Sequence, residues 1–322
     1  MAYLDHWSEL LGQVPKLDMF LAQKLINRAW RDIRDSRLWS FLVSETTIDA
    51  PDAISSGSVT VTQDSSTVIG DATADAAWAA IGNTELQKRV FRAGLGGPIY
   101  RIASYASPNL SLQRNYQEST AAGTVYLIYK CYYPVPATNF IRWISVIDPI
   151  NGYRLASGRT KAELDFRDPQ RSATTQPYVI ASYLYDTTVT PNTWLNELYP
   201  HPVVRRSYPA LYSHRGLDFV DDTDTLPAII PDEVLMHRAK FYAYEWAAAN
   251  SSQHAELRDV NWQYLRSQSM ANYAKDIEKA KRNDEEIFRQ NYVESYLTDR
   301  YKLLNFDGSY AQSHAPAYGW YR

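Results

Sequence analysis

Several features that mark secreted or membrane proteins are scarce in this sequence. Its 322 residues include a single cysteine, Cys131, so no internal disulfide can form and a reducing compartment suits the chain. No apolar run approaches the roughly 20 residues that cross a bilayer. The N-terminus lacks the basic start and apolar core of a signal peptide. We therefore expect a soluble protein that has no membrane partner.

A strong charge of either sign is also missing. The chain carries 33 basic and 36 acidic residues, which leaves a formal net charge of only −3 with both signs interspersed. Such a chain creates no overall field that would attract nucleic acid or an anionic membrane. This balance argues against a nonspecific DNA-binding domain.

Motifs of catalysis and ligand binding are scarce as well. The six histidines never fall at zinc-ligand spacing, and no serine lies in a glycine-flanked nucleophile turn. The segment "AGLGGP" (Ala93–Pro98) has no following lysine with serine or threonine, which predicts a turn and not a phosphate loop. The acidic "DDTDT" (Asp221–Thr225) is followed by Leu226 and Pro227, where a calcium loop needs a ligand and a glycine. We expect no cofactor, no metal and no catalytic residue.

Aromatic residues, in contrast, are abundant. The chain has 25 tyrosines and 9 tryptophans. Both residue types supply a large contact area with one polar group, and both are enriched at protein interfaces as well as in β cores. This composition favours a protein with several contact surfaces.

The segment "GSVTVTQDSSTVIG" (Gly57–Gly70) predicts a short hairpin, because valine and threonine alternate on both sides of a polar turn. Further β-branched and aromatic runs follow as far as about Asp224, separated by turn signals such as Asn151 with Gly152. Their spacing predicts a small antiparallel barrel or sandwich. Alternating βαβ units are not indicated.

Helical periodicity occupies both ends of the chain. It runs from Leu17 to about Leu42 and returns at Ile230 in two long segments. The charges of the first helix predict a solvated face with close pairs of opposite sign; they are Arg28, Arg31, Asp32, Arg34, Asp35 and Arg37.

The predicted fold class is α+β: a helical bundle from the N- and C-terminal segments, a large inserted antiparallel β barrel or sandwich domain, and an extended C-terminal tail. The expected regions are N-terminal helices in residues 1–45, the β domain in 46–224, C-terminal helices in 225–296 and the tail in 297–322. The tail is aromatic without periodic structure, which is typical of a segment that orders on a partner.

Beyond these patterns, the chain from about Leu17 to Tyr273 resembles the head-to-tail adaptor, or connector, proteins of the neck of tailed bacteriophages. Between the helical ends, the segments that carry the resemblance are "GSVTVTQDSSTVIG", Trp78, "PIYRIASYASPNLSL" (Pro98–Leu112), "DFRDPQRSATTQPYVI" (Asp165–Ile180), "ELYPHPVVRRSYPALYSHR" (Glu197–Arg215) and "LPAIIPDEVL" (Leu226–Leu235). The β region of this chain is larger than that of the minimal helical adaptors.

The resemblance implies a structural virion protein that is assembled in the host cytoplasm. Such proteins form a ring, usually dodecameric, between the portal protein above and the tail below, and genomic DNA passes through the centre. The implied partners are the portal, tail or nozzle proteins, other copies of the same chain, and DNA without sequence-specific binding.

Two groups of residues are candidate contact sites under this reading. The tail aromatics Tyr310, Tyr318, Trp320 and Tyr321 are predicted portal anchors. The hairpin loop Gln63, Asp64, Ser65 and Ser66 is predicted to face tail or fibre proteins.

Two other functions stay open at this stage. Exposed tyrosine and tryptophan stack on sugars, so the β region is also compatible with a carbohydrate-binding or tail-fibre-associated module. Acidic pairs such as Asp165 and Asp168 in a β cleft are compatible with a cell-wall hydrolase, although spacing alone assigns no acid or base.

Overall fold

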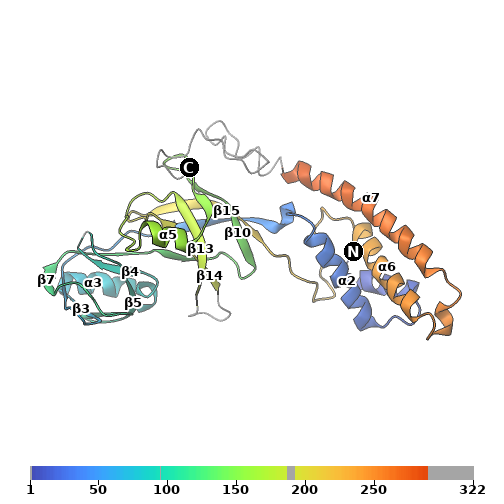
Figure 1. The fold of residues 1–322 in the computed structure, drawn as a ribbon, viewed down its shortest axis with the longest axis horizontal. Coiled ribbons are helices and arrows are strands. Elements are labelled where there is room, and N and C mark those ends of the chain that lie inside the picture. The colour runs from blue at the N-terminus through green and yellow to red at the C-terminus, as the bar shows by residue number, and fades with distance from the viewer. Residues whose placement is uncertain (1, 95, 187–192, 289–322) are drawn as a thin grey trace. The chain divides into compact units, whose positions relative to one another are not determined.

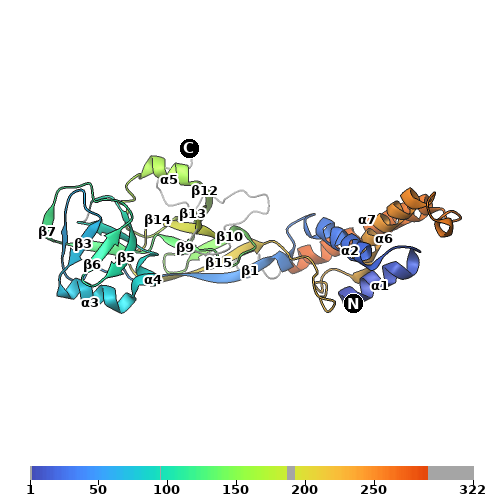
Figure 2. The same ribbon diagram turned by 90° about the horizontal axis from the view of Figure 1, so that it is seen from below.

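The computed structural model describes residues 2–94, 96–186 and 193–288, and its fold is mixed α+β. The chain forms two compact units. The helical unit combines residues 1–43 with residues 215–322, and the β unit comprises residues 44–214. Figures 1 and 2 show the two units in two views.

The described part of the chain contains seven α-helices. They are α1 Tyr3–Gln13, α2 Met19–Arg34, α3 Ala72–Ile81, α4 Asn83–Leu86, α5 Lys161–Arg167, α6 Asp232–Asn250 and α7 Trp262–Phe288. Two short 3₁₀ turns, Ser40–Leu42 and Ala255–Leu257, precede the first strand and α7.

Fifteen strands are described, and all of them lie in the β unit except for Val43, the first residue of β1. They are β1 Val43–Ala50, β2 Val59–Val61, β3 Thr67–Gly70, β4 Val90–Ala93, β5 Tyr100–Ala106, β6 Asn109–Leu112, β7 Ala121–Thr124, β8 Tyr126–Tyr129, β9 Tyr132–Pro134, β10 Phe140–Asp148, β11 Tyr153–Arg154, β12 Ala156–Arg159, β13 Val179–Asp186, β14 Thr193–Tyr199 and β15 Arg206–His214.

In the helical unit, α6 is the central helix and contacts α1, α2 and α7. Figure 1 shows α6 between α2 and the long α7. Its Val234, Leu235, Ala239 and Ala243 are fully buried in the shared core, because apolar or small residues recur on every side of the helix. Burial of this one helix by three neighbours joins residues 3–42 and residues 219–280 in a single core.

The predicted hairpin is confirmed. β2 and β3 pair antiparallel with Val59 opposite Gly70 and Val61 opposite Val68. The three valines are buried, whereas Ile69 is exposed, so alternation along the strands separates a core face from a solvent face.

The hairpin belongs to a seven-stranded antiparallel sheet in the order β7-β2-β3-β6-β5-β4-β8. Its two edge strands, β7 and β8, are consecutive in the chain and are separated only by Val125. The sheet must therefore curl until its edges approach, which gives a half-barrel. Trp78 of α3 fills its interior and donates from Nε1 to the Tyr126 hydroxyl at 3.1 Å.

Two four-stranded sheets form the rest of the β unit, in the orders β1-β15-β10-β11 and β12-β13-β14-β9. They share one core, in which Trp143 of β10 donates to Asn196 of β14 at 2.8 Å. One detail differs from the all-antiparallel expectation, because β12 pairs with β13 in parallel. The predicted β region also contains three helices, α3, α4 and α5.

Candidate functional site

The predicted portal anchors Tyr310, Tyr318, Trp320 and Tyr321 lie outside the described residues, and their role stays a prediction.

The predicted tail-facing loop is a tight turn with little free backbone. Asp64 has a positive φ of 61°, and its N–H donates to the Tyr116 carbonyl at 2.7 Å. The Ser65 carbonyl accepts from the Tyr116 N–H, and the Ser66 carbonyl accepts from the Leu112 N–H. Gln63 and Asp64 are exposed, whereas Ser65 and Ser66 are half-buried, so only the first two residues of the loop are well placed for a partner.

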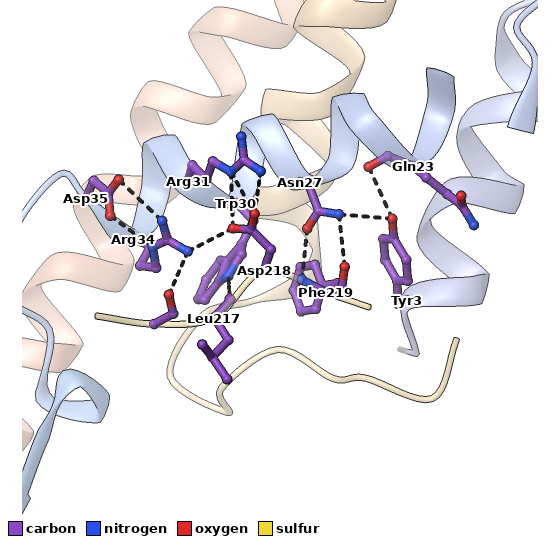
Figure 3. A network of polar contacts seen from close by, with 11 residues as sticks. Tyr3, Gln23, Asn27, Trp30, Arg31, Arg34, Asp35, Leu217, Asp218 and Phe219 are labelled. Atoms are coloured by element: carbon purple, nitrogen blue, oxygen red, sulfur yellow. Dashed lines mark hydrogen bonds and ion pairs between the residues drawn. The ribbon is translucent and has the colours of Figure 1, made fainter. Parts of the chain in front are cut away.

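A second exposed feature is a loop that we call the return loop, residues 216–224, where the chain re-enters the helical unit. Figure 3 shows how α2 holds it. Arg34 donates to the Gly216 carbonyl at 2.8 Å and to Asp218 Oδ1 at 3.0 Å. Arg31 forms a fork with both oxygens of Asp218. The paired arginines thus fix the start of the return loop to the end of α2.

The middle of the return loop is held by its backbone. Asn27 donates to the Phe219 carbonyl at 3.0 Å and accepts from the Phe219 N–H at 2.9 Å. Trp30 Nε1 donates to the Leu217 carbonyl at 2.8 Å. The Phe219 ring lies 5.3 Å from that of Tyr3 and 5.4 Å from that of Trp30. An amide that pairs with both backbone groups of one residue fixes the register of the loop on the helix.

The far end of the return loop closes on itself. Asp224 Oδ2 accepts from the Val220 N–H at 2.7 Å and the Asp221 N–H at 2.9 Å, and these hydrogen bonds hold the pKa of Asp224 below its usual range. Trp7 donates to Asp222 at 3.3 Å. The acidic segment considered above as a calcium loop therefore uses Asp222 and Asp224 to shape the loop itself.

This scaffold leaves apolar side chains in solvent. Leu217 is 75% exposed and Val220 is 82% exposed. Figure 3 shows the Leu217 side chain pointing away from α2 while Asp218 turns toward it. Asp221 and Asp222, beside Val220, are also exposed. A rigid loop thus presents two apolar and two acidic residues to the outside.

The charges of α2 correct one expectation from the sequence. Arg34 is 2% exposed, so it does not belong to a solvated face. Asp32 pairs with Arg238 of α6 at 2.6 Å, and Arg37 lies 3.6 Å from the buried Asp284 of α7. Among the described ion pairs of these six charges, the Arg34–Asp35 pair is the only one between residues close in the sequence. Most of these charges connect α2 to segments far away in the sequence, and periodicity in one helix carries no sign of such partners.

The β unit contains a surface pocket of about 380 Å³, which we call the basic pocket. Its lining residues are Ile99, Arg101, Gln113, Arg114, Tyr132, Lys161, Asp165, Pro169 and Arg171. Four of the nine are cationic and one is a carboxylate. The lining therefore favours an anionic group.

Two of the cations have no carboxylate partner among the described residues. Arg101 lies over the ring of Tyr132, 4.3 Å from its centroid. Arg114 lies over the ring of Tyr100 at 4.7 Å and donates one hydrogen bond to the Ile99 carbonyl at 3.0 Å. A planar guanidinium stacked on an aromatic ring keeps its edge available for a carboxylate.

Arg171 forms the inner end of the basic pocket and is already fully engaged. It pairs with Glu197 and Asp165, each at 2.6 Å, and donates to the Asp168 carbonyl. Burial raises the pKa of Glu197 to about 6 despite this arginine. His201, 3.5 Å from Glu197 and fully buried, has a pKa lowered to about 3, chiefly by burial. These residues are an internal ionic cluster that adjoins the pocket through Arg171 and Asp165.

Other chemistry is limited in the described part of the chain. No group of three or more histidine, cysteine, aspartate or glutamate side chains there is arranged to hold a metal ion. Among the same residues, no helix is both long and apolar enough to cross a bilayer. Burial also raises the pKa of the Cys131 thiol.

Two comparisons found no match: no protein-family model matches the chain, and no curated protein sequence matches it.

Proposed function

We propose that this chain is a structural subunit of the neck of a tailed bacteriophage. It forms a ring, usually of twelve copies, between portal and tail, and genomic DNA passes through the centre without sequence-specific binding. The proposal rests on the sequence resemblance described above, and it assigns no enzymatic activity to the chain.

The observation that carries the proposal furthest is the exposure of large apolar side chains on well-supported backbone in both units. In the helical unit these include Phe20, Leu217 and Val220, and in the β unit they include Ile150 and Phe166. Phe166, on α5, is 93% exposed. A ring subunit has to contact two neighbours, the portal and the tail, so several separate contact surfaces are expected.

The two units suit a division of labour within such a ring. In this proposal the helical unit is a bundle that forms the ring body, and its C-terminal tail binds the portal through Tyr310, Tyr318, Trp320 and Tyr321. The β unit is an inserted domain that contacts tail or fibre proteins, with Gln63 and Asp64 at the tip of its hairpin.

The alternative functions receive less support from the described side chains. Sugar binding by stacking needs exposed aromatic rings, and among the β-unit residues whose side-chain exposure the structure describes, only Phe166 and Trp194 are exposed large aromatics. A hydrolase needs an acid or base within reach of substrate, whereas Glu197 and His201, a neighbouring acid and base whose pKa values are both shifted by burial, are fully buried.

The direct test is the number of copies per virion. Quantitative mass spectrometry of purified particles should give about one copy of this chain per portal subunit. Absence from the particle, or a ratio far from one, would contradict the proposal and move glycan binding by residues 44–214 to the front.

A deletion tests the portal anchors separately. Removing Asn305–Arg322 deletes none of the residues described here, so both units should retain their circular dichroism spectrum. We expect the shortened chain to lose binding to the portal in a pull-down assay. Substituting Gln63 and Asp64 by alanine is the matched control, because it should spare the portal and impair tail attachment. Undiminished portal binding after the deletion would refute the tail assignment.

A further inference from the structure

The return loop and the basic pocket are complementary in charge and in polarity. The loop presents acidic Asp221 and Asp222 beside the apolar Val220. The basic pocket presents Arg101 and Arg114 without carboxylate partners among the described residues. The loop thus supplies carboxylates, and the pocket supplies arginines without a carboxylate partner.

Apolar contacts are available on both sides of the same pairing. Phe166 is adjacent to the pocket residue Asp165 and is 93% exposed, and the pocket lining includes Ile99 and Pro169. On the loop side, Leu217 and Val220 are exposed. Interfaces commonly combine such aromatic or aliphatic anchors with a polar surround.

We propose that the return loop of one copy of this chain docks in the basic pocket of a second copy. The inference rests on the proposed ring, because it assigns one of the contacts between neighbouring subunits. Asp221 and Asp222 pair with Arg101 and Arg114 of the neighbour, and Phe166 of the neighbour covers Val220.

The state of each group before docking favours this occupant. The Asp221 carboxylate has no hydrogen bond or ion pair with another described residue, so it gives up no partner when it enters the pocket, whereas Asp222 already accepts from Trp7 Nε1 at 3.3 Å through Oδ1. The hydrogen bonds of Asn27, Trp30 and Asp224 already hold the loop, so little backbone order has to be gained. Arg101 and Arg114 keep their ring contacts and gain a carboxylate partner.

The proposed contact is also of a type that can build a ring. The loop belongs to the helical unit and the pocket to the β unit, so the two copies use different surfaces. Contacts of this heterologous type leave one loop and one pocket free after each step, and they produce closed rings or open chains instead of isolated dimers.

Disulfide trapping between two separately purified variants tests the contact. One variant carries Asp221→Cys on the loop, and the other carries Gln113→Cys on the pocket lining together with a size tag. The single native cysteine, Cys131, is buried and does not compete. Mixing the two variants under mild oxidation should give a tagged heterodimer at least about tenfold faster than the matched control, in which Gln63→Cys replaces Gln113→Cys.

Charge reversal then tests the chemistry of the trapped contact. Adding Arg114→Glu to the pocket variant, or Asp222→Lys to the loop variant, should slow trapping at least about fivefold. Combining the two reversals should restore the rate, and 1 M NaCl should slow the unmodified pair. Rates equal to the Gln63→Cys control, or a doubly reversed pair no faster than the single reversals, would overturn the inference.

The result separates this inference from the proposed function. A virion count near one copy per portal subunit without specific trapping would leave the ring in place and reject the loop and pocket as its contact. A specific trap with no copies in the virion would support the contact between copies and reject the neck assignment.

Discussion

Replacing Asp218 by asparagine should destabilise the helical unit, because this carboxylate neutralises two arginines of α2. Arg34 is 2% exposed and its Nη1 lies 3.0 Å from Asp218 Oδ1, whereas Arg31 is largely exposed. The substitution preserves the shape of the side chain and removes its charge. It therefore tests the electrostatic part of the contact shown in Figure 3.

The magnitude follows mainly from Arg34. Removing one partner of a buried ion pair costs about 3–5 kcal/mol, because the remaining charge stays desolvated. Arg34 keeps its ion pair with Asp35 and its hydrogen bond to the Gly216 carbonyl, and Asp218 itself is one third exposed, so Arg34 is not left uncompensated and the loss falls below this range. Arg31 adds little, because exposed pairs are screened by solvent. We expect a loss of about 2 kcal/mol in the free energy of unfolding, the size of one hydrogen bond to a charged group.

Urea unfolding followed by circular dichroism at 222 nm measures this loss, since α2, α6 and α7 dominate the helical signal. The matched control is Asp221→Asn, the same change three residues further along in the return loop. Its carboxylate has no partner among the described residues, so the change should stay within about 0.5 kcal/mol. Equal effects of the two substitutions would refute the role assigned to Asp218.

The same pair of proteins gives a pH test. The hydrogen bonds and charge of Arg31, followed by those of Arg34, hold the pKa of Asp218 below its usual range. A carboxyl whose pKa is lower in the folded state stabilises the fold above its unfolded pKa of about 3.9, and this contribution is lost as the pH falls through the folded value. The difference between wild type and Asp218→Asn should be constant from pH 7 to about pH 5 and should shrink below pH 4.

Two further substitutions test the β unit and one control tests the helical unit, all by urea unfolding. Gly57→Ala should lower the free energy of unfolding by about 3 kcal/mol, because φ is +84° and a Cβ atom would lie 2.4 Å from Asp71 Oδ1. The control is Gly12→Ala, whose Cβ would meet nothing within 4 Å and which should stabilise α1 by up to about 1 kcal/mol. Similar effects at both sites would contradict the reasoning. Burial lowers the pKa of His201 to about 3, so His201 stabilises the fold above its unfolded pKa of about 6.5, and that contribution disappears as the pH falls. His201→Leu should therefore lose less stability than wild type on acidification, by about 1.4 kcal/mol per pH unit below pH 6. Glu197, whose pKa is raised to about 6, has the opposite effect and is present in both proteins, so parallel pH profiles would refute the assignment to His201.

Local patterns predicted the regular elements well where one face is buried. Val59, Val61 and Val68 alternate with exposed residues, so the hairpin was evident from the sequence. The helical period also identified α2 and α6, because their apolar positions lie on the faces that contact the core.

Three helices inside the β region were missed, although two of them have local signals. Asp71 caps α3 by accepting from the Ala74 N–H at 2.8 Å. Thr160 and Glu163 form a capping box at the start of α5. Strong β patterns on both sides outweighed these short signals, and an alanine-rich helix such as α3 has little polar contrast between its faces.

The candidate contact surfaces could not be predicted, because their members are distant in the sequence. Arg34 and Asp218 are 184 residues apart, and the basic pocket combines Arg101 and Arg114 with a segment that begins at Lys161. Only the fold brings such residues together. From the sequence, Asp221 and Asp222 were visible as an acidic cluster, whereas the support that makes them a rigid surface was not.

The chain enters the β unit through β1 and leaves it through β15, and these two strands, the first and last of the unit, lie side by side in one sheet. A side-chain hydrogen bond also links the two strands, because Ser207 of β15 donates to Asp49 of β1 at 2.5 Å, and just outside the strands the Arg205 backbone N–H donates to Asp52 at 2.8 Å. Neighbouring first and last strands let residues 44–214 leave the rest of the chain and return to it close together. The chain re-enters the helical unit at the return loop, which Arg34 fixes to α2 through the Gly216 carbonyl and Asp218. These fixing residues adjoin the residues proposed to contact the next subunit, so a change of contact surface at Val220 or Asp221 need not disturb the contacts of Arg34 and Asp218.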